Sequence, residues 1–451
     1  MKHRSIALAL AIFFTFGGNA RSRFAQPSLM PAERLLERAK AHLAENPEDA
    51  KAHYVVGRIH YLAFYNRASL VAVYGQAEKQ DLPSIAPYWT AEQRYIYDAR
   101  RAEATRRTLE KMGAESVTEI EPEDARDYYQ TVSTLTQQLT KQEWKPNVVD
   151  PGISSEHATL ALQAFDQAID LEPDNPLYLL GKASLLEQAS TFYTEEKPKR
   201  ADPILSKITP GQIRDGYYRA FATGLEEALK RKTRPVTGLR SIASYEAGKA
   251  YERLCGETKD LSKQETDRLE EVTTNLTKLD KLRRGAITPI VFSTDSNAEF
   301  DDLIEPSKRV SFDLDGDGVT EEWPWVRNDT ALLVWDPDRN GRILSGRQLF
   351  GSYTWQIPWE NGYEPLAMLD RSGDGQLSGM ELEGIRVWFD RDGDGFSDTG
   401  EVVDLNQLNI RSIRTAGTRN RKTNLWFNQR GISLNGGEAL ATWDWVPSRG
   451  E

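Results

Sequence analysis

Four Asp- and Gly-rich segments within ninety residues constrain the fold of this 451-residue chain more than any other feature. The segments begin at Asp313, Asp336, Asp370 and Asp390, and each has glycine at its sixth position. Ca²⁺ takes six to eight oxygen ligands, which a twelve-residue loop supplies from positions 1, 3, 5, 7, 9 and 12 around a sharp turn at the sixth. Asp and Gly also build ordinary polar turns. Four such segments so close together favour calcium binding.

Two of the four segments carry complete ligand sets with a glutamate at position 12. The third segment offers Asp370, Ser372, Asp374, the carbonyl of Gln376 and Glu381. The fourth offers Asp390, Asp392, Asp394, the carbonyl of Phe396 and Glu401. A closing carboxylate of this kind binds Ca²⁺ through both oxygens. We expect an amphipathic helix between the two loops, with Leu382, Ile385, Trp388 and Phe389 facing the core.

The other two segments lack the closing carboxylate. The second offers Asp336, Asp338, Asn340 and the carbonyl of Arg342, but has Arg347 at position 12. We expect weaker binding there, or a loop that hydrogen bonds alone hold in shape. The first offers Asp313, Asp315 and Asp317, with Pro324 at position 12 and Glu321 or Glu322 as possible substitutes. It could be a shorter Asp-rich loop between β-strands. Ile343 and Leu377 could pair as a β-bridge between the second and third loops.

The region from about residue 288 to 403 resembles the EF-hand-like calcium module of exported bacterial RTX-type proteins. The segments that carry the resemblance are 312–318, Trp325-Val326, Asn340 to Ile343, Leu349 to Gly351, Asn361 to Glu364 and Arg386 to Trp388. The sequence departs from the family pattern at Arg347-Gln348, where an acidic residue is usual. The resemblance implies calcium as the cofactor and implies no catalytic activity.

The N-terminal residues predict export. A basic segment, Lys2 to Arg4, precedes an apolar run from Ser5 to Phe16, and small residues precede a cleavage point after Ala20. We therefore expect a signal peptide over residues 1–20 and a periplasmic or extracellular location, with an N-terminal membrane anchor as the alternative. Cys255 is the only cysteine, so an intramolecular disulfide is excluded. Bound metal could stabilise the exported domain instead.

Residues 31–256 have the pattern of a helical domain. Two stretches, 32–64 and 158–189, each hold two amphipathic runs broken at Asn-Pro, and Gly57 and Gly181 fall where helices would approach closely. They resemble tetratricopeptide repeats, in the 158–189 stretch through Ala161, Phe165, Ala168 and Pro173. An unrelated helical bundle has a similar pattern. Residues 257–285 are expected to form a helical linker.

The sequence thus predicts a mainly α protein: an irregular TPR-like solenoid, then an α+β domain at 286–451 with EF-hand-like loops and short strands. The strands include 424–427 and 441–446. The net charge of −11 disfavours a nucleic-acid surface, and no later segment is suited to stable membrane insertion.

We expect a calcium-binding protein whose helices hold a protein partner, without catalysis. All five histidines precede residue 160, and no phosphate-binding Gly-rich loop or Gly-x-Ser-x-Gly motif occurs. The alternative is an exported carbohydrate-active or glycan-binding protein. Its sugar-stacking residues would be Trp323, Trp325, Trp335, Trp355 and Trp359.

Overall fold

The computed structural model describes a helical N-terminal part and a β-rich C-terminal part. The residues described are 29–65, 70–72, 107–108, 111–112, 131, 151–198, 201–230, 239–279, 288–314, 320–337, 339, 341–421, 423 and 425–447. The chain divides into two compact units, residues 1–25 with 87–149 and residues 26–86 with 150–451. All elements below belong to the second unit. The predicted signal peptide lies outside the described residues, as do Asp315, Asp317, Asp338 and Asn340.

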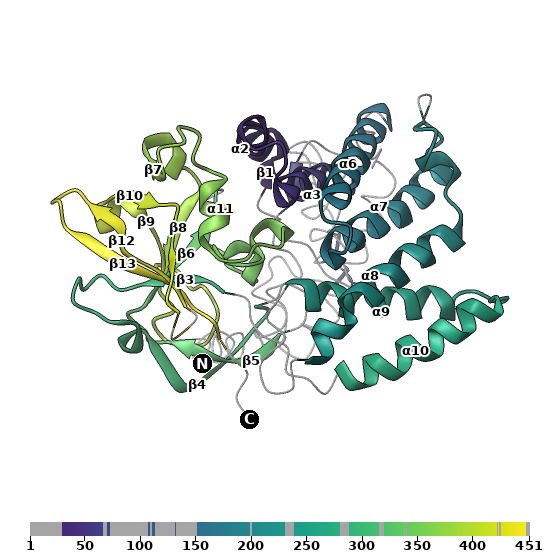
Figure 1. Cartoon of the computed structure of the whole chain (residues 1–451). Coiled ribbons are helices and arrows are strands. Elements are labelled where there is room, and N and C mark those ends of the chain that lie inside the picture. Colours follow the sequence, from purple (N-terminus) through teal and green to yellow (C-terminus); the bar gives the residue numbers. More distant parts are fainter. Residues whose placement is uncertain are drawn as a thin grey trace. The chain divides into compact units, whose positions relative to one another are not determined.

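The N-terminal part is built from antiparallel helix pairs (Figure 1). The helices are α2 (Ala32–Glu45), α3 (Ala50–Tyr65), α6 (Pro151–Leu171), α7 (Pro176–Glu195), α8 (Pro210–Lys230), α9 (Leu239–Gly256) and α10 (Lys263–Leu279). A short pairing of β1 (Leu29–Pro31) with β2 (Leu70–Ala72) flanks α2. The predicted breaks at Asn46-Pro47 and Asn175-Pro176 are confirmed. Asn175 caps α7 by accepting a hydrogen bond from the backbone N–H of Leu177.

Two glycines let helices from distant parts of the sequence pack closely. A Cβ on Gly57 of α3 would lie 2.7 Å from the Phe165 ring of α6. A Cβ on Gly181 of α7 would lie 3.0 Å from the same ring and from Tyr54. The predicted close approach at both glycines is therefore confirmed. Phe165 is the buried side chain that fills the junction of α3, α6 and α7.

The C-terminal part is an antiparallel β half-barrel. The strand order of its nine-stranded sheet is β7, β10, β12, β13, β3, β6, β8, β9, with β11 beside β12. The bounds are β3 (Ile290–Phe292), β6 (Ala331–Trp335), β7 (Gln376–Ser378), β8 (Ile385–Trp388), β9 (Val402–Asp404), β10 (Ile410–Arg414), β11 (Thr418–Arg419), β12 (Trp426–Leu434) and β13 (Ala439–Asp444). A separate hairpin joins β4 (Ile304–Phe312) to β5 (Glu321–Val326), and α11 (Tyr363–Ala367) is the one α-helix among the described residues of this part. The strands predicted near 424–427 and 441–446 are confirmed.

The predicted helical N-terminal part is confirmed, but the protein is not mainly α, and the helix predicted between the third and fourth loops is wrong. Because the C-terminal part is mostly strands, the protein is α+β overall. Ile385 and Trp388 lie in strand β8, where Ile385 and Val387 are buried and Arg386 between them is partly exposed. Alternation with period two therefore prevails over the helical spacing. The preceding 3₁₀ turn (Gly379–Leu382) ends at Glu383, which is extended, and Gly384 follows at φ +90°, a conformation that disfavours a continuing helix.

The predicted β-bridge between Ile343 and Leu377 is also wrong. Leu377 pairs with Ile413 in the β7–β10 ladder, and the backbone N–H of Ile343 donates to the Ser397 hydroxyl at 2.7 Å. The second loop therefore contacts the fourth loop rather than the third.

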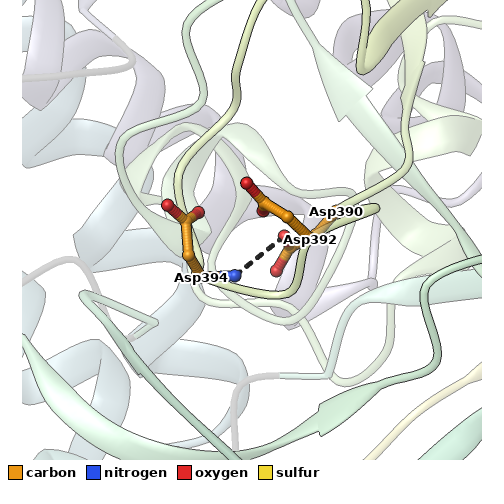
Figure 2. Close-up of side chains that lie close together, drawn as sticks. All are labelled: Asp390, Asp392 and Asp394. Atoms are coloured by element: carbon orange, nitrogen blue, oxygen red, sulfur yellow. Dashed lines mark hydrogen bonds between the residues drawn. The ribbon is translucent and has the colours of Figure 1, made fainter.

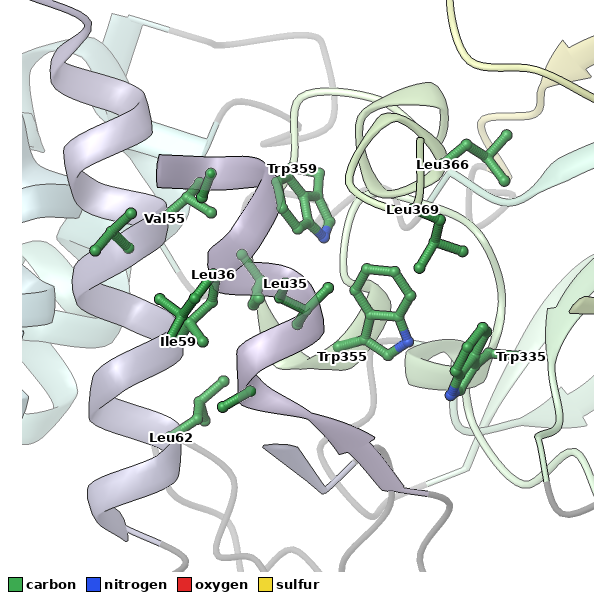
Figure 3. Close-up of a cluster of buried hydrophobic side chains, with 14 of the residues drawn as sticks. Leu35, Leu36, Val55, Ile59, Leu62, Trp335, Trp355, Trp359, Leu366 and Leu369 are labelled. Carbon is green, nitrogen blue, oxygen red and sulfur yellow. The ribbon is translucent and has the colours of Figure 1, made fainter. Parts of the chain in front are cut away.

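The buried apolar side chains form three clusters, one of which spans the helices and the sheet (Figure 3). Leu35 and Leu36 of α2 pack with Ile59 of α3, and this group continues into Trp355 and Trp335 of the β-rich part. From α3, the buried Arg58 guanidinium donates two hydrogen bonds to the carbonyl of Gln356, at 3.0 and 3.1 Å. No helix in the described parts of the chain is long and apolar enough to cross a bilayer.

Candidate metal-binding loops

The third loop, 370–381, is folded around its first and last carboxylates. The buried Asp370 accepts hydrogen bonds from the backbone N–H groups of Gly373 and Gly375, at 2.7 and 2.9 Å. Glu381 reaches back to accept from the N–H groups of Ser372 and Ser378, at 2.9 and 3.1 Å. Gly375, at φ +81°, makes the turn that the sixth position requires. The carboxylates at positions 1 and 12 therefore enclose the same loop.

The fourth loop, 390–401, repeats this arrangement. Asp390 accepts from the N–H groups of Gly393 and Gly395, at 2.8 and 3.0 Å, and Glu401 accepts from Arg391 and Asp398, at 2.6 and 3.1 Å. Gly395 has φ +79°. The donors at positions 4, 6 and 9 match in the two loops, but the closing glutamate also accepts from position 3 in the third loop and from position 2 in the fourth.

Three carboxylates of the fourth loop converge on one point (Figure 2). One oxygen from each of Asp390, Asp392 and Asp394 lies within 4.8 Å of the others. Ca²⁺–oxygen distances of about 2.3–2.6 Å place ligands on opposite sides of the ion about 5 Å apart. The spacing therefore fits a Ca²⁺ ion. Among the described residues this is the one group of three or more acidic, His or Cys ligands that meets this distance limit.

The pKa values of the loop aspartates are shifted in different directions in the two loops. Desolvation raises the pKa of Asp390 to about 6, although the backbone N–H of Gly395 and the Trp325 indole stabilise its charged form. Desolvation also raises the pKa of Asp394. In the third loop, by contrast, the backbone N–H of Gln376 holds the pKa of the exposed Asp374 below its ordinary value. The fourth loop therefore holds negative charge at a higher energetic cost than the third.

Two buried indoles contact the fourth loop. The Trp325 Nε1–H of β5 donates to Asp390 Oδ2 at 2.5 Å, and the Trp388 Nε1–H of β8 lies 3.4 Å from Glu401 Oε2. The two rings stack edge to face, with centroids 6.0 Å apart. Sequence reasoning missed both contacts. Trp325 is 65 positions from Asp390, and no short-range pattern links them.

The second loop is closed by side chains of the protein itself. The buried Asp336 accepts from the Gly341 N–H at 2.9 Å and forms an ion pair with the Arg386 guanidinium at 3.2 Å. The Gln348 side-chain amide donates to the carbonyl of Arg342 at 2.8 Å. Both groups expected to bind metal at positions 1 and 7 thus already have protein donors. These contacts agree with the expected loop held by hydrogen bonds, and Arg386 is a residue that the sequence did not predict.

The first loop falls between strands β4 and β5, and its residues 315–319 lie outside the described residues. Asp313 is buried, and its carbonyl accepts from the Gly346 N–H at 2.8 Å. The hairpin also contacts the fourth loop, since a Cβ on Gly395 would lie 2.3 Å from Val310 of β4. The first, second and fourth loops therefore adjoin one another, whereas the third loop contacts helix α2.

The five tryptophans proposed for sugar stacking are buried. Trp323, Trp325, Trp335, Trp355 and Trp359 are each at most 3% exposed. Trp335 and Trp355 pack edge to face, with ring centroids 5.6 Å apart. A ring that stacks on a sugar must present one face to solvent. The burial therefore favours packing of the core over glycan binding for these five residues.

Comparison with known proteins finds similarity for the β-rich part, but not to the module that its loops suggest. A family model described as the SPM domain matches residues 300–438. The iron-regulated protein FrpA of Neisseria meningitidis serogroup C is 36% identical over 110 residues, which are 23% of this chain and 10% of that protein. The chain thus spans about a tenth of the length of this relative.

The predicted resemblance to the EF-hand-like RTX module was therefore wrong. The match at 300–438 is to the SPM domain, without an EF-hand or RTX signal, and strands take the place of the helices that flank EF-hand loops. The tetratricopeptide resemblance of the helical part is unconfirmed, because the family match lies wholly outside that part. The ligand spacing concerns only the loop residues themselves, so it did not determine the elements around the loops or the family.

Proposed function

We propose that the β-rich part binds calcium at two loops, 370–381 and 390–401. The convergence of Asp390, Asp392 and Asp394 within 4.8 Å carries the proposal, because these oxygens match the size of a Ca²⁺ coordination sphere. Loop 370–381 joins it because its first aspartate accepts from the same two loop positions and its position-12 glutamate is enclosed in the same way. Loop 336–347 is not assigned an ion, since Arg386 and Gln348 occupy its key oxygens.

In this proposal calcium stabilises the fold of an exported protein and takes part in no catalytic step. The single cysteine, Cys255, excludes internal disulfides as the stabilising device. Calcium sites of extracellular modules have dissociation constants of about 10⁻⁴–10⁻³ M. When the free calcium concentration is a hundred times the dissociation constant, one site contributes about 2.7 kcal/mol to the free energy of unfolding. The helical part then serves as a platform for a protein partner.

The test is calcium titration of the full chain by calorimetry, together with thermal unfolding with and without calcium. We expect two binding events and a higher melting temperature in millimolar calcium. Magnesium is the control, because it prefers a smaller octahedral shell and binds such loops less well. Absence of both calcium heat and a thermal shift would contradict the proposal.

A further inference from the structure

Helix α2 contacts loop 370–381 at the residue that closes the loop. Arg34 of α2 donates to the carbonyl of Glu381 at 3.3 Å and to the carbonyl of Glu383 at 3.4 Å. The side chain of Glu381 meanwhile accepts from the backbone N–H groups of Ser372 and Ser378. The carboxylate of Glu381 thus belongs to the proposed calcium site, whereas its backbone carbonyl contacts helix α2.

The segment that follows Glu381 has little freedom to move independently of α2. The Arg34 guanidinium lies over the Trp335 ring, 5.4 Å from its centroid. A Cβ on Gly384 would lie 2.5 Å from the same ring, so this position requires glycine. The backbone N–H of Asp336 donates to the Gly384 carbonyl at 2.8 Å. A shift of the main chain at 381–384 would therefore disturb the contacts of Arg34.

The start of the loop also contacts α2. Arg371 forms an ion pair with Glu37 at 2.6 Å, and the Arg38 guanidinium would lie 3.4 Å from a Cβ on Gly373. Next to these polar contacts, Leu35 and Leu36 of α2 are buried in the shared core. Loop 390–401 makes its outer contacts to Trp325 and Trp388 within the β-rich part instead.

We propose that loop 370–381 is a calcium-dependent anchor for helix α2, and that Arg34 transmits its occupancy. The inference rests on the proposed function of this loop. A metal that binds Glu381 fixes the carbonyls that Arg34 needs, so calcium and the docked helix stabilise each other. Such coupling is reciprocal. If calcium strengthens the helix contact by a given factor, loss of that contact weakens calcium binding by the same factor.

The experiment isolates the third loop in full-length Glu401→Gln protein, whose fourth loop is disabled. Calorimetry then reports loop 370–381 alone. We expect Arg34→Met to weaken calcium binding at this loop about fivefold or more. The matched control is Lys51→Met, which removes an ion pair with Glu364 across the same helix–sheet contact but away from the loop. The control is expected to keep the parent affinity.

Amide hydrogen exchange provides a second measurement that needs no change in α2. Calcium is expected to slow exchange in residues 32–45 of Glu401→Gln protein, and Glu381→Gln in the same background is expected to abolish the slowing. Equal calcium affinity in Arg34→Met and the parent, or exchange in α2 indifferent to calcium, would overturn the anchor while leaving calcium binding intact. Absence of any calcium heat in Glu401→Gln protein would overturn the proposed site and the anchor with it.

Discussion

Loops 370–381 and 390–401 share a ligand pattern and a buried aspartate at position 1, but they contact different parts of the molecule. The third loop has an exposed Asp374 with a lowered pKa at position 5 and borders helix α2. The fourth has a buried Asp390 with a raised pKa and borders two indoles of the β-rich core. The position of a residue in the loop determines which of its atoms face the ion. The surroundings of the loop determine the free-energy cost of keeping its carboxylates ionised. Two loops with the same motif therefore need not have the same calcium affinity.

The closing glutamates give the largest expected effect. Glu381→Gln and Glu401→Gln each remove a bidentate charge, and we expect each loop to lose at least about 100-fold in calcium affinity, more than outer contacts usually contribute. Calorimetry should show one remaining event in each variant and none in the double variant. Two undiminished events in either single variant would contradict the assignment of that loop.

The indole contact should matter to the fourth loop alone. Trp325→Phe removes the N–H donor to Asp390 and is expected to weaken calcium binding there roughly 10–100-fold, with the third loop unchanged. Trp359→Phe is the matched control, because it removes an equally buried indole N–H that donates to the Thr354 carbonyl. Calcium titrations in the Glu381→Gln background measure both. Equal losses in the two variants would indicate general destabilisation instead.

Lowering the pH should reduce the calcium affinity of the fourth loop more than that of the third. Asp390 binds calcium only when ionised, so with its pKa at about 6 the fourth loop is expected to bind about tenfold more weakly at pH 5 than at pH 7. Asp374, whose pKa is lowered, stays ionised over this range, and the third loop should change less. Titrations of Glu381→Gln and Glu401→Gln protein at both pH values report the two loops separately.

In the calcium-free protein, acid should have the opposite effect at Asp390: it should stabilise the fold rather than weaken binding. In the native state Asp390 takes up a proton at about pH 6, because its pKa is about 6. In the unfolded chain its pKa is 3.8, so it takes up that proton only at about pH 3.8. Protonation of Asp390 therefore adds stability to the calcium-free protein as the pH falls from 6 toward 4. Chemical unfolding in a calcium chelator at several pH values measures this term, which Asp390→Asn should remove.

The smallest effect is expected at the outer edge of the third loop. Arg371→Ala breaks the ion pair with Glu37, in which both side chains are more than half exposed. Exposed pairs contribute about 0.2–1 kcal/mol because water and salt screen them. We expect the free energy of unfolding to fall by less than about 1 kcal/mol. A larger loss, insensitive to salt, would show that this edge is less solvated than its exposure indicates.

Local sequence rules predicted the features that depend on neighbouring residues. The helix breaks at Asn-Pro, the two close-approach glycines and the C-terminal strands were all predicted, because each depends on a short pattern. Strand β8 was mistaken for a helix because Ile385 and Trp388, three positions apart, fit the helical period. In the strand they face opposite sides of a sheet that is buried on both, and the pairing with β6 and β9 that selects the strand is not visible in the local sequence.

The parts of the site that could not be predicted all come from distant segments. Arg386 reaches Asp336 across 50 positions, Trp325 reaches Asp390 across 65, and Arg34 reaches Glu381 across 347. No spacing rule relates such residues. The ligand pattern also gave the wrong family, since a loop needs only its own twelve residues to adopt this conformation.

The junction of Gly57, Phe165 and Gly181 has a consequence for how the chain can vary. It joins α3 to α6, helices that are adjacent in space but about a hundred positions apart in sequence. Doubling the length of a connecting segment costs only about 0.6 kcal/mol in closure entropy. The packing of α3 on α6 therefore sets little demand on the length of the sequence that separates the two helices.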